Sequence, residues 1–181
     1  MKTPRFVTLL ALAFVSSLFA AEVAKDRATG NDRVPFPKDY TTAFQEIRVS
    51  NKTGQTLLGS IYANAPAASV GELAKLPYPY GSVVVMEWAQ PVKGANGELL
   101  LDANGNWKKG AVVRVDVMRR EKDFGTAYGD KRAGEWEFAS YRPDGSAFTP
   151  AINAASCAEC HAKAAERDFV FRGRFPAIEN K

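Results

Sequence analysis

The sequence predicts an α+β fold, built mainly from an antiparallel β-sheet with a few short helices. Segments rich in β-branched and aromatic residues carry this prediction, because they alternate or run as strands do. Asn-Gly and Asp-Gly pairs at 96–97, 104–105 and 144–145 supply tight turns between and after them. Strands that follow one another through turns pair antiparallel. The expected strands are 56–63, 82–88, 111–119 and 135–141.

Three short helices are expected beside the sheet. The first follows two prolines, where apolar residues recur at helical spacing. Each of the other two begins with a capping box, a serine followed three residues later by a glutamate. The first helix is predicted at Tyr40, Phe44 and Ile47. The second begins with the capping box Ser69 and Glu72 and ends before Pro77. The third covers Cys157–Arg167, with Ser156 and Glu159 as its capping box.

The first 20 residues have the pattern of a secretory signal peptide, with Lys2 and Arg5 before an apolar core and small residues near Ala20. The apolar core is too short to span a bilayer comfortably, and a retained membrane anchor is the alternative. We therefore expect cleavage after Ala20 and a periplasmic protein without a membrane span. The rest divides into a flexible tail at 21–34 and a single domain at 35–181.

The amino-acid composition argues against a nucleic-acid partner and limits the number of possible metal ligands. Lys and Arg together number 24 against 20 Asp and Glu, and no basic tract stands out that would follow a phosphate backbone. A nucleic-acid partner is therefore not expected. The chain has two cysteines and one histidine in all, which limits metal chemistry to very few ligands.

Both cysteines and the histidine lie in one motif, Cys157-Ala-Glu-Cys160-His161. The pattern C-x-x-C-H is the attachment motif of a c-type heme. On a helix, residues three apart lie on one side, so both thiols can form thioethers with the two vinyl groups of one heme. His161 then presents its imidazole to the iron. We predict one covalently bound heme c, held by Cys157 and Cys160, with His161 as the metal ligand.

Three other uses of the motif are weaker. A disulfide between the cysteines can form in an exported protein, but it leaves His161 without a role. Structural zinc normally takes four Cys or His ligands, and the chain has three such residues in total. A thioredoxin-like pair needs a βαβ context, which the strand pattern does not offer.

The sixth iron position has no second histidine to fill it. After signal cleavage, Met86 and Met118 remain as thioether candidates, and a Met/His pair is typical of electron carriers. Both methionines lie in predicted strands, where methionine more often packs a core. We therefore favour an open sixth position, which can bind small gases. A Met/His-ligated electron carrier stays an alternative.

From about residue 36 to residue 176 the chain resembles the cytochrome P-460 family, and most closely its cytochrome c′-beta members. The resemblance rests on four segments: IYAN (61–64), PYGSVVVME (79–87), GEWEFASYRPDG (134–145) and CAECHAKAAERDFVF (157–171). It implies a mainly β-sheet fold, usually a homodimer, with one c-type heme whose histidine-ligated iron is five-coordinate.

The resemblance implies one of two functions. Cytochrome P-460 proper carries a lysine joined to the heme and oxidises hydroxylamine, whereas cytochrome c′-beta has an apolar pocket that binds nitric oxide or carbon monoxide. Met86 stands where the lysine is expected, and residues 150–156 contain no carboxylate to serve as a distal proton acceptor. Both differences favour gas binding over enzymatic oxidation, with one-electron transfer to an unknown redox partner as an added role. Lys93 keeps the oxidising alternative open.

Candidate pocket residues follow from strand alternation. If residues 82–88 border the heme, Val84, Met86 and Trp88 share one side of the strand. Ile61 on the preceding strand then joins them in an apolar distal pocket. Ordinary packing in the sheet core is the alternative for each of these residues.

Charged residues near the strands are further candidates for contacts with the heme. A guanidinium group pairs well with a carboxylate such as a heme propionate, which makes Arg114, Arg132 and Arg142 candidates. Glu135 and Glu137 are candidate distal bases, although alternation in their strand favours solvent exposure for both.

Overall fold

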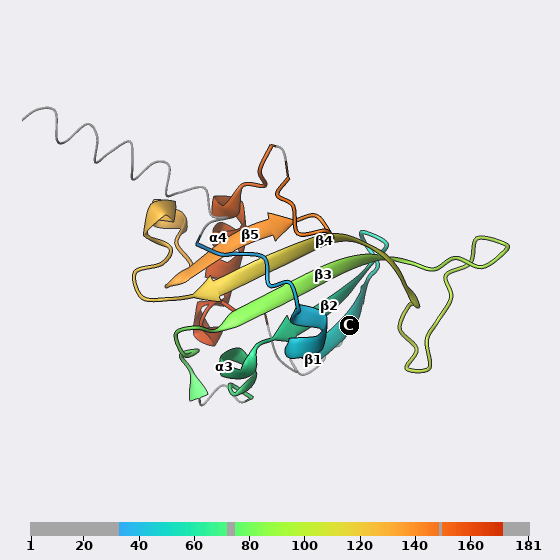
Figure 1. The fold of residues 1–181 in the computed structure, drawn as a ribbon, viewed down its shortest axis with the longest axis horizontal. Coiled ribbons are helices and arrows are strands. Elements are labelled where there is room, and N and C mark those ends of the chain that lie inside the picture. The colour runs from blue at the N-terminus through green and yellow to red at the C-terminus, as the bar shows by residue number, and fades with distance from the viewer. Residues whose placement is uncertain (1–32, 72–74, 149, 172–181) are drawn as a thin grey trace, which may run out of the picture.

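The computed structural model describes residues 33–71, 75–148 and 150–171. Its centre is a five-stranded antiparallel sheet in which neighbours in sequence are neighbours in space (Figure 1). The α+β fold with a mainly antiparallel sheet is thereby confirmed. The strands are β1 (Gln45–Lys52), β2 (Leu57–Ala63), β3 (Val83–Pro91), β4 (Lys109–Arg120) and β5 (Trp136–Tyr141).

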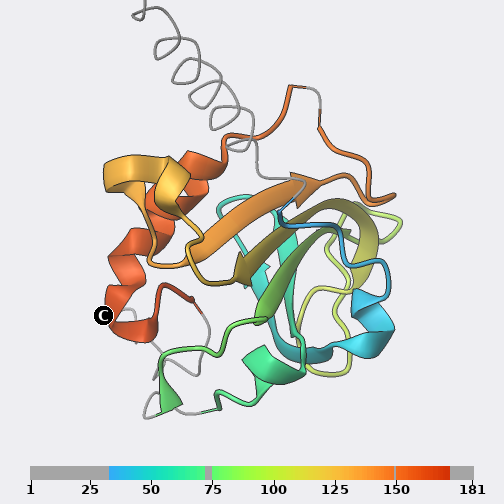
Figure 2. The ribbon, with the colours of Figure 1, turned by 60° about the vertical axis from the view of Figure 1, so that its left-hand side comes forward.

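Short helices pack beside the sheet. The helix α4 lies against β5 and continues directly into the 3-10 helix η4 (Figure 2). Within the described ranges, no helix has the length and apolar character of a membrane span. The described helices are α2 (Tyr40–Ala43), α3 (Ala65–Ala68), η3 (Thr126–Lys131), α4 (Ala154–His161) and η4 (Ala162–Arg167).

Alternation along the strands builds an apolar core on each face of the sheet. On one face Val84, Met118 and Phe138 oppose one another in β3, β4 and β5 and pack against α4. We call this side the α4 face. On the other face Val85 and Val115 are fully buried in a second core. The sheet is therefore covered on both sides, and α4 is positioned by the first of these cores.

The predicted helix through Ile47 is wrong beyond its first turn. The helix α2 ends at Ala43, and Ile47 lies in β1, a strand that the sequence analysis misses. The strand β1 pairs with β2 from Gln45 to Lys52, and so covers a hydrogen-bonding edge of β2 that would otherwise be open. Helical spacing of three apolar residues is a weaker local preference than this pairing.

The helix that carries the C-x-x-C-H motif begins earlier than its capping box predicts. Its first residue is Ala154, and the Asn153 side chain caps it by accepting a hydrogen bond from the Ala155 amide at 3.1 Å. Ser156 lies inside the first turn and donates to the Asn153 carbonyl at 2.7 Å. Asparagine caps helices as well as serine does, so the serine–glutamate pattern marks the wrong start.

The other predicted capping box fails in a similar way. Asn64 caps α3 by accepting from the Ala67 amide at 3.1 Å, and Ser69 lies at the end of that helix rather than at the start of another. The helix expected from Glu72 falls partly on residues 72–74, which lie outside the described part of the chain.

The last two residues of the predicted tail at 21–34 both contact strand β5. Val34 is fully buried, and its carbonyl accepts a hydrogen bond from the Tyr141 hydroxyl. Arg33 pairs with Glu137 at 2.9 Å, which explains why Glu137 is buried and not solvent-exposed as expected. The predicted signal peptide at 1–20 and the remainder of the predicted tail fall on residues outside the described part of the chain.

Candidate heme site

A cavity of about 250 Å³ lies between the α4 face of the sheet and α4. Its sheet wall is mostly apolar and comes from four strands. The helix contributes Cys157, Cys160 and His161. The structure thus brings the whole C-x-x-C-H motif to one apolar cavity. The apolar sheet residues that line it include Ile61, Val84, Met86, Trp88, Met118 and Phe138.

Strand register explains how residues far apart in the sequence meet at this cavity. Met86 of β3 pairs with Ile61 on one side and with Asp116 on the other. Asp116 in turn pairs with Ser140 of β5. Directly opposed residues of neighbouring strands project on the same face, so these four side chains form one row across the sheet. Of the predicted pocket residues, Val84, Met86, Trp88 and Ile61 all line the cavity.

The two cysteines line the cavity from α4, one helical turn apart. Both are free thiols, so the disulfide alternative is not formed. Cys160 is exposed and Cys157 is half-buried, and burial raises the pKa of the Cys157 thiol. Two free thiols on one side of a helix beside an apolar cavity suit thioether attachment of a porphyrin.

His161 is held in a defined orientation at the end of α4. Its Nδ1 lies 2.7 Å from the Phe169 carbonyl. A carbonyl can only accept, so Nδ1 carries the proton and Nε2 keeps the lone pair that a metal needs. The ring lies 4.8 Å from each of the Phe138 and Phe171 rings, and burial lowers the pKa of His161, which favours the neutral imidazole.

Asp116 places a carboxylate in the mostly apolar sheet wall. The Trp88 indole donates to it at 2.7 Å and the Ser140 hydroxyl at 2.6 Å. The Arg114 guanidinium forms an ion pair with it at 3.1 Å and lies over the Trp88 ring. Asp116 is not among the site residues predicted from the sequence, because its position depends on the pairing of β4 with β3 and β5.

The three arginines proposed as propionate partners lie in different places. Arg114 reaches the cavity wall through Asp116. Arg132 donates to the backbone carbonyls of Gly134 and Phe124, and Arg142 donates to a carbonyl in its own turn. Of the three, Arg114 is therefore the one whose position suits a contact at the cavity.

The two glutamates and the lysine named in the sequence analysis do not line the cavity. Glu135 accepts from the Tyr80 hydroxyl at 2.7 Å, and Glu137 pairs with Arg33. Lys93 lies in the connection between β3 and β4, which leaves the sheet at the end far from α4 (Figure 1). None of the three is placed to act as a distal base or to reach a ligand in this cavity.

The donor set at the cavity fits a c-type heme. The two thiols and the free Nε2 of His161 come from a single stretch of helix, and apolar strand residues face them across the cavity. Met86 and Met118 also line the wall, so either thioether is close to the site. Among the described residues, no group of three His, Cys, Asp or Glu side chains is arranged to hold a bare metal ion.

Comparison with known proteins agrees with this site. A sequence model of the cytochrome P460 family matches residues 37–172, which is more than half of the chain. A search of curated proteins finds no significant match. The matched region contains all five strands, the cavity wall and the C-x-x-C-H motif. The chain therefore belongs to the cytochrome P460 family and is a heme-binding cytochrome.

Proposed function

We propose that this protein is a periplasmic cytochrome of the c′-beta kind, which binds nitric oxide at a five-coordinate heme iron. One heme c is attached through Cys157 and Cys160, and His161 is the proximal ligand. When bound, the heme supplies an iron that coordinates a neutral diatomic gas and exchanges one electron. Homodimer formation and transfer of that electron to a separate redox partner belong to the same proposal.

The main support for this proposal is that the hydrogen-bond donors of the sheet wall already have an acceptor within the protein. Trp88 and Ser140 are the described strand residues at the cavity whose side chains hold an N–H or O–H group, and both donate to Asp116. Neither is therefore free to stabilise a polar ligand. Donors in the distal pocket decide whether a heme favours dioxygen or other small molecules. A wall without free donors suits nitric oxide or carbon monoxide.

The presence of Met86 favours gas binding over hydroxylamine oxidation at a heme cross-linked to lysine. It lies in the cavity wall at the position where the resemblance expects a lysine. A thioether has no amine to bond to the heme edge. Its terminal methyl lies so close to Gly59 that a Cβ there would be 2.8 Å away. The glycine leaves the space that the Met86 side chain occupies.

Hydroxylamine oxidation, as in cytochrome P-460 proper, is a second candidate, favoured by one observation. Asp116 provides a carboxylate at the cavity, and a carboxylate there can accept the protons that the oxidation releases. Three groups already engage it, namely Trp88, Ser140 and Arg114. These donors already occupy the carboxylate oxygens, which leaves them poorly placed to take a proton from a substrate, so gas binding is the better supported function.

Absorption spectra of the purified holoprotein test the proposal. We expect high-spin ferric and ferrous spectra without added ligand, and a clear change when nitric oxide is added to the ferrous form. A low-spin spectrum that nitric oxide leaves unchanged would instead indicate a Met/His-ligated carrier. A red-shifted ferrous band would indicate a cross-linked heme and the oxidising function.

A further inference from the structure

The carbonyl that holds the His161 ring belongs to a strained turn. Asp168 and Phe169, which follow η4, both have left-handed backbone, with φ of 50° and 65°. Residues other than glycine rarely adopt this conformation, and such strain persists only where surrounding contacts enforce it. The position of the Phe169 carbonyl, and with it the orientation of His161, therefore depends on whatever holds this turn.

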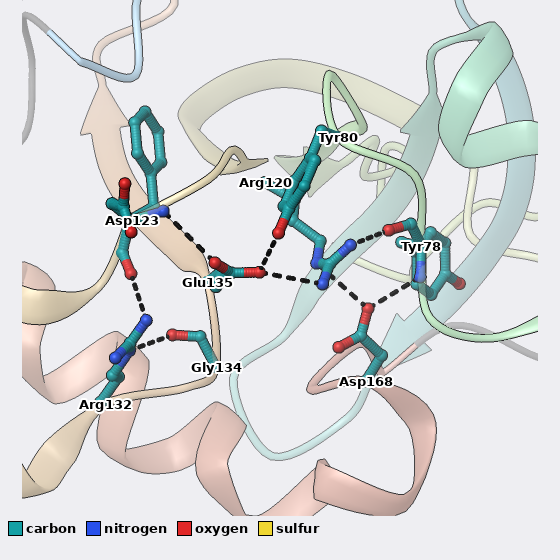
Figure 3. Close-up of polar contacts among 9 residues, drawn as sticks. Tyr78, Tyr80, Arg120, Asp123, Arg132, Gly134, Glu135 and Asp168 are labelled. Carbon is teal, nitrogen blue, oxygen red and sulfur yellow. Dashed lines mark hydrogen bonds and ion pairs between the residues drawn. The ribbon is translucent and has the colours of Figure 1, made fainter.

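Contacts with residues far away in the sequence hold the Asp168 side chain. Its carboxylate accepts from the Tyr78 amide at 2.8 Å and forms an ion pair with Arg120 Nε at 3.5 Å. Tyr78 is 90 residues away in the sequence, and Arg120 is the last residue of β4. Figure 3 shows Asp168 enclosed by these two residues. The turn is thus fastened to the sheet and to the segment before β3.

Arg120 is itself fixed by further partners. Its Nη2 lies 3.2 Å from Glu135, its Nη1 donates to the Tyr78 carbonyl, and its guanidinium lies 4.7 Å from the centre of the Tyr80 ring (Figure 3). The Arg120 side chain is 11% exposed and that of Asp168 is 12% exposed. Ion pairs that water hardly reaches are screened much less than surface pairs. These contacts therefore hold the Arg120 and Asp168 side chains in one fixed arrangement.

A second contact fixes Phe169 independently. Its ring packs on Gly134, where an added Cβ would come within 2.4 Å of the ring. Gly134 has a φ of 55°, which favours glycine at this position. The backbone of Phe169 is therefore held in two ways, by the contacts of the preceding Asp168 side chain and by the packing of its own ring on Gly134.

We propose that Arg120 and Asp168 are positioning residues for the proximal histidine, acting through the Phe169 carbonyl. This inference rests on the proposed role of His161 as the iron ligand. A firm hydrogen bond to Nδ1–H orients the imidazole and makes Nε2 a stronger donor to a metal. Loosening the turn weakens that bond, which lowers the strength of the iron–histidine bond and raises the reduction potential of the heme.

The test uses the holoprotein and three substitutions in the network. Asp168→Ala removes the carboxylate that contacts the Tyr78 amide and Arg120. Arg120→Gln removes the ion pair with Asp168 together with the one to Glu135. Asp168→Asn keeps an acceptor for the Tyr78 amide and tolerates left-handed backbone, so it should restore most of the wild-type behaviour. Arg119→Gln is the control, because it removes an arginine ion pair at the neighbouring position of β4, the more exposed one with Glu121 at 2.7 Å, and leaves the Arg120–Asp168 pair in place.

The measurements are the iron–histidine stretching band of the ferrous protein by resonance Raman spectroscopy, and the reduction potential. We expect a lower stretching frequency and a higher potential in Asp168→Ala and Arg120→Gln, a smaller change in Asp168→Asn, and none in Arg119→Gln. If Asp168→Ala does not fold, Asp168→Asn and Arg120→Gln carry the test. Variants with full heme content and an unchanged band and potential would overturn the inference. A wild-type protein without an iron–histidine band would instead refute the proposed function.

Discussion

Replacing Asp116 with leucine perturbs the one carboxylate that engages the donors of the cavity wall. The change removes the acceptor of the Trp88 and Ser140 hydrogen bonds, at 2.7 and 2.6 Å. A hydrogen bond to a charged group stabilises a fold by about 1.5–3 kcal/mol. The Asp116 side chain is 29% exposed, so water replaces part of what is lost. We therefore expect the free energy of unfolding to fall by about 2–4 kcal/mol, measured by urea denaturation.

The same substitution should change ligand discrimination. It leaves the Trp88 indole and the Ser140 hydroxyl free to donate into the cavity. One neutral hydrogen bond is worth about 0.5–1.5 kcal/mol, which corresponds to about 2- to 10-fold slower release of a ligand that accepts it. Dioxygen accepts such a bond well and carbon monoxide poorly. Stopped-flow release from the ferrous holoprotein should therefore slow for dioxygen and change little for carbon monoxide.

A second variant separates the freed donors from the loss of charge. Combining Asp116→Leu with Trp88→Phe removes the indole donor as well, so the slowing for dioxygen should shrink. Equal effects on dioxygen and carbon monoxide in Asp116→Leu would refute the argument that engaged donors set the selectivity of this cavity. An undiminished effect in the double variant would instead assign the slowing to Ser140.

Three further outcomes are expected. Burial raises the pKa of Tyr128 to about 12. The free energy of unfolding should therefore fall between about pH 10 and pH 12, where the unfolded chain has lost this proton and the folded chain still holds it. Denaturation of Tyr128→Phe across that range should show a shallower fall, and an equal fall would contradict the raised pKa. Tyr141→Phe removes the buried hydrogen bond to the Val34 carbonyl and should lower the free energy of unfolding by about 1–3 kcal/mol, whereas no measurable loss would show that this contact does not anchor the chain. Met86→Ala and Met118→Ala should leave the high-spin ferric spectrum of the holoprotein unchanged, and a change of spin state in either would identify that methionine as an iron ligand.

Strands β2 to β5 could be predicted from sequence because their signals are local. Each has β-branched or alternating apolar residues, and the Gly97, Gly105 and Gly145 turns have the left-handed φ that Asn-Gly and Asp-Gly pairs favour. The C-x-x-C-H motif is local too, and strand alternation was enough to group Val84 with Met86. These features need no knowledge of what lies beside them.

The missed features depend on contacts between distant segments. The strand β1 is fixed by its pairing with β2, and Glu137 is buried because Arg33, outside the expected domain, pairs with it. Asp116 enters the cavity wall only through a register that joins three strands. Asp168 reaches Arg120 across the fold. No periodicity within a short window contains this information.

The most direct measurement of the central claim is the intact mass of the protein after export from cells that mature c-type cytochromes, taken under denaturing conditions. The claim predicts a polypeptide carrying one heme that acid–acetone extraction does not remove, with peptide mapping placing it on Cys157 and Cys160. A colourless protein, a heme that extracts, or an additional bond to the heme beyond the two thioethers would contradict it.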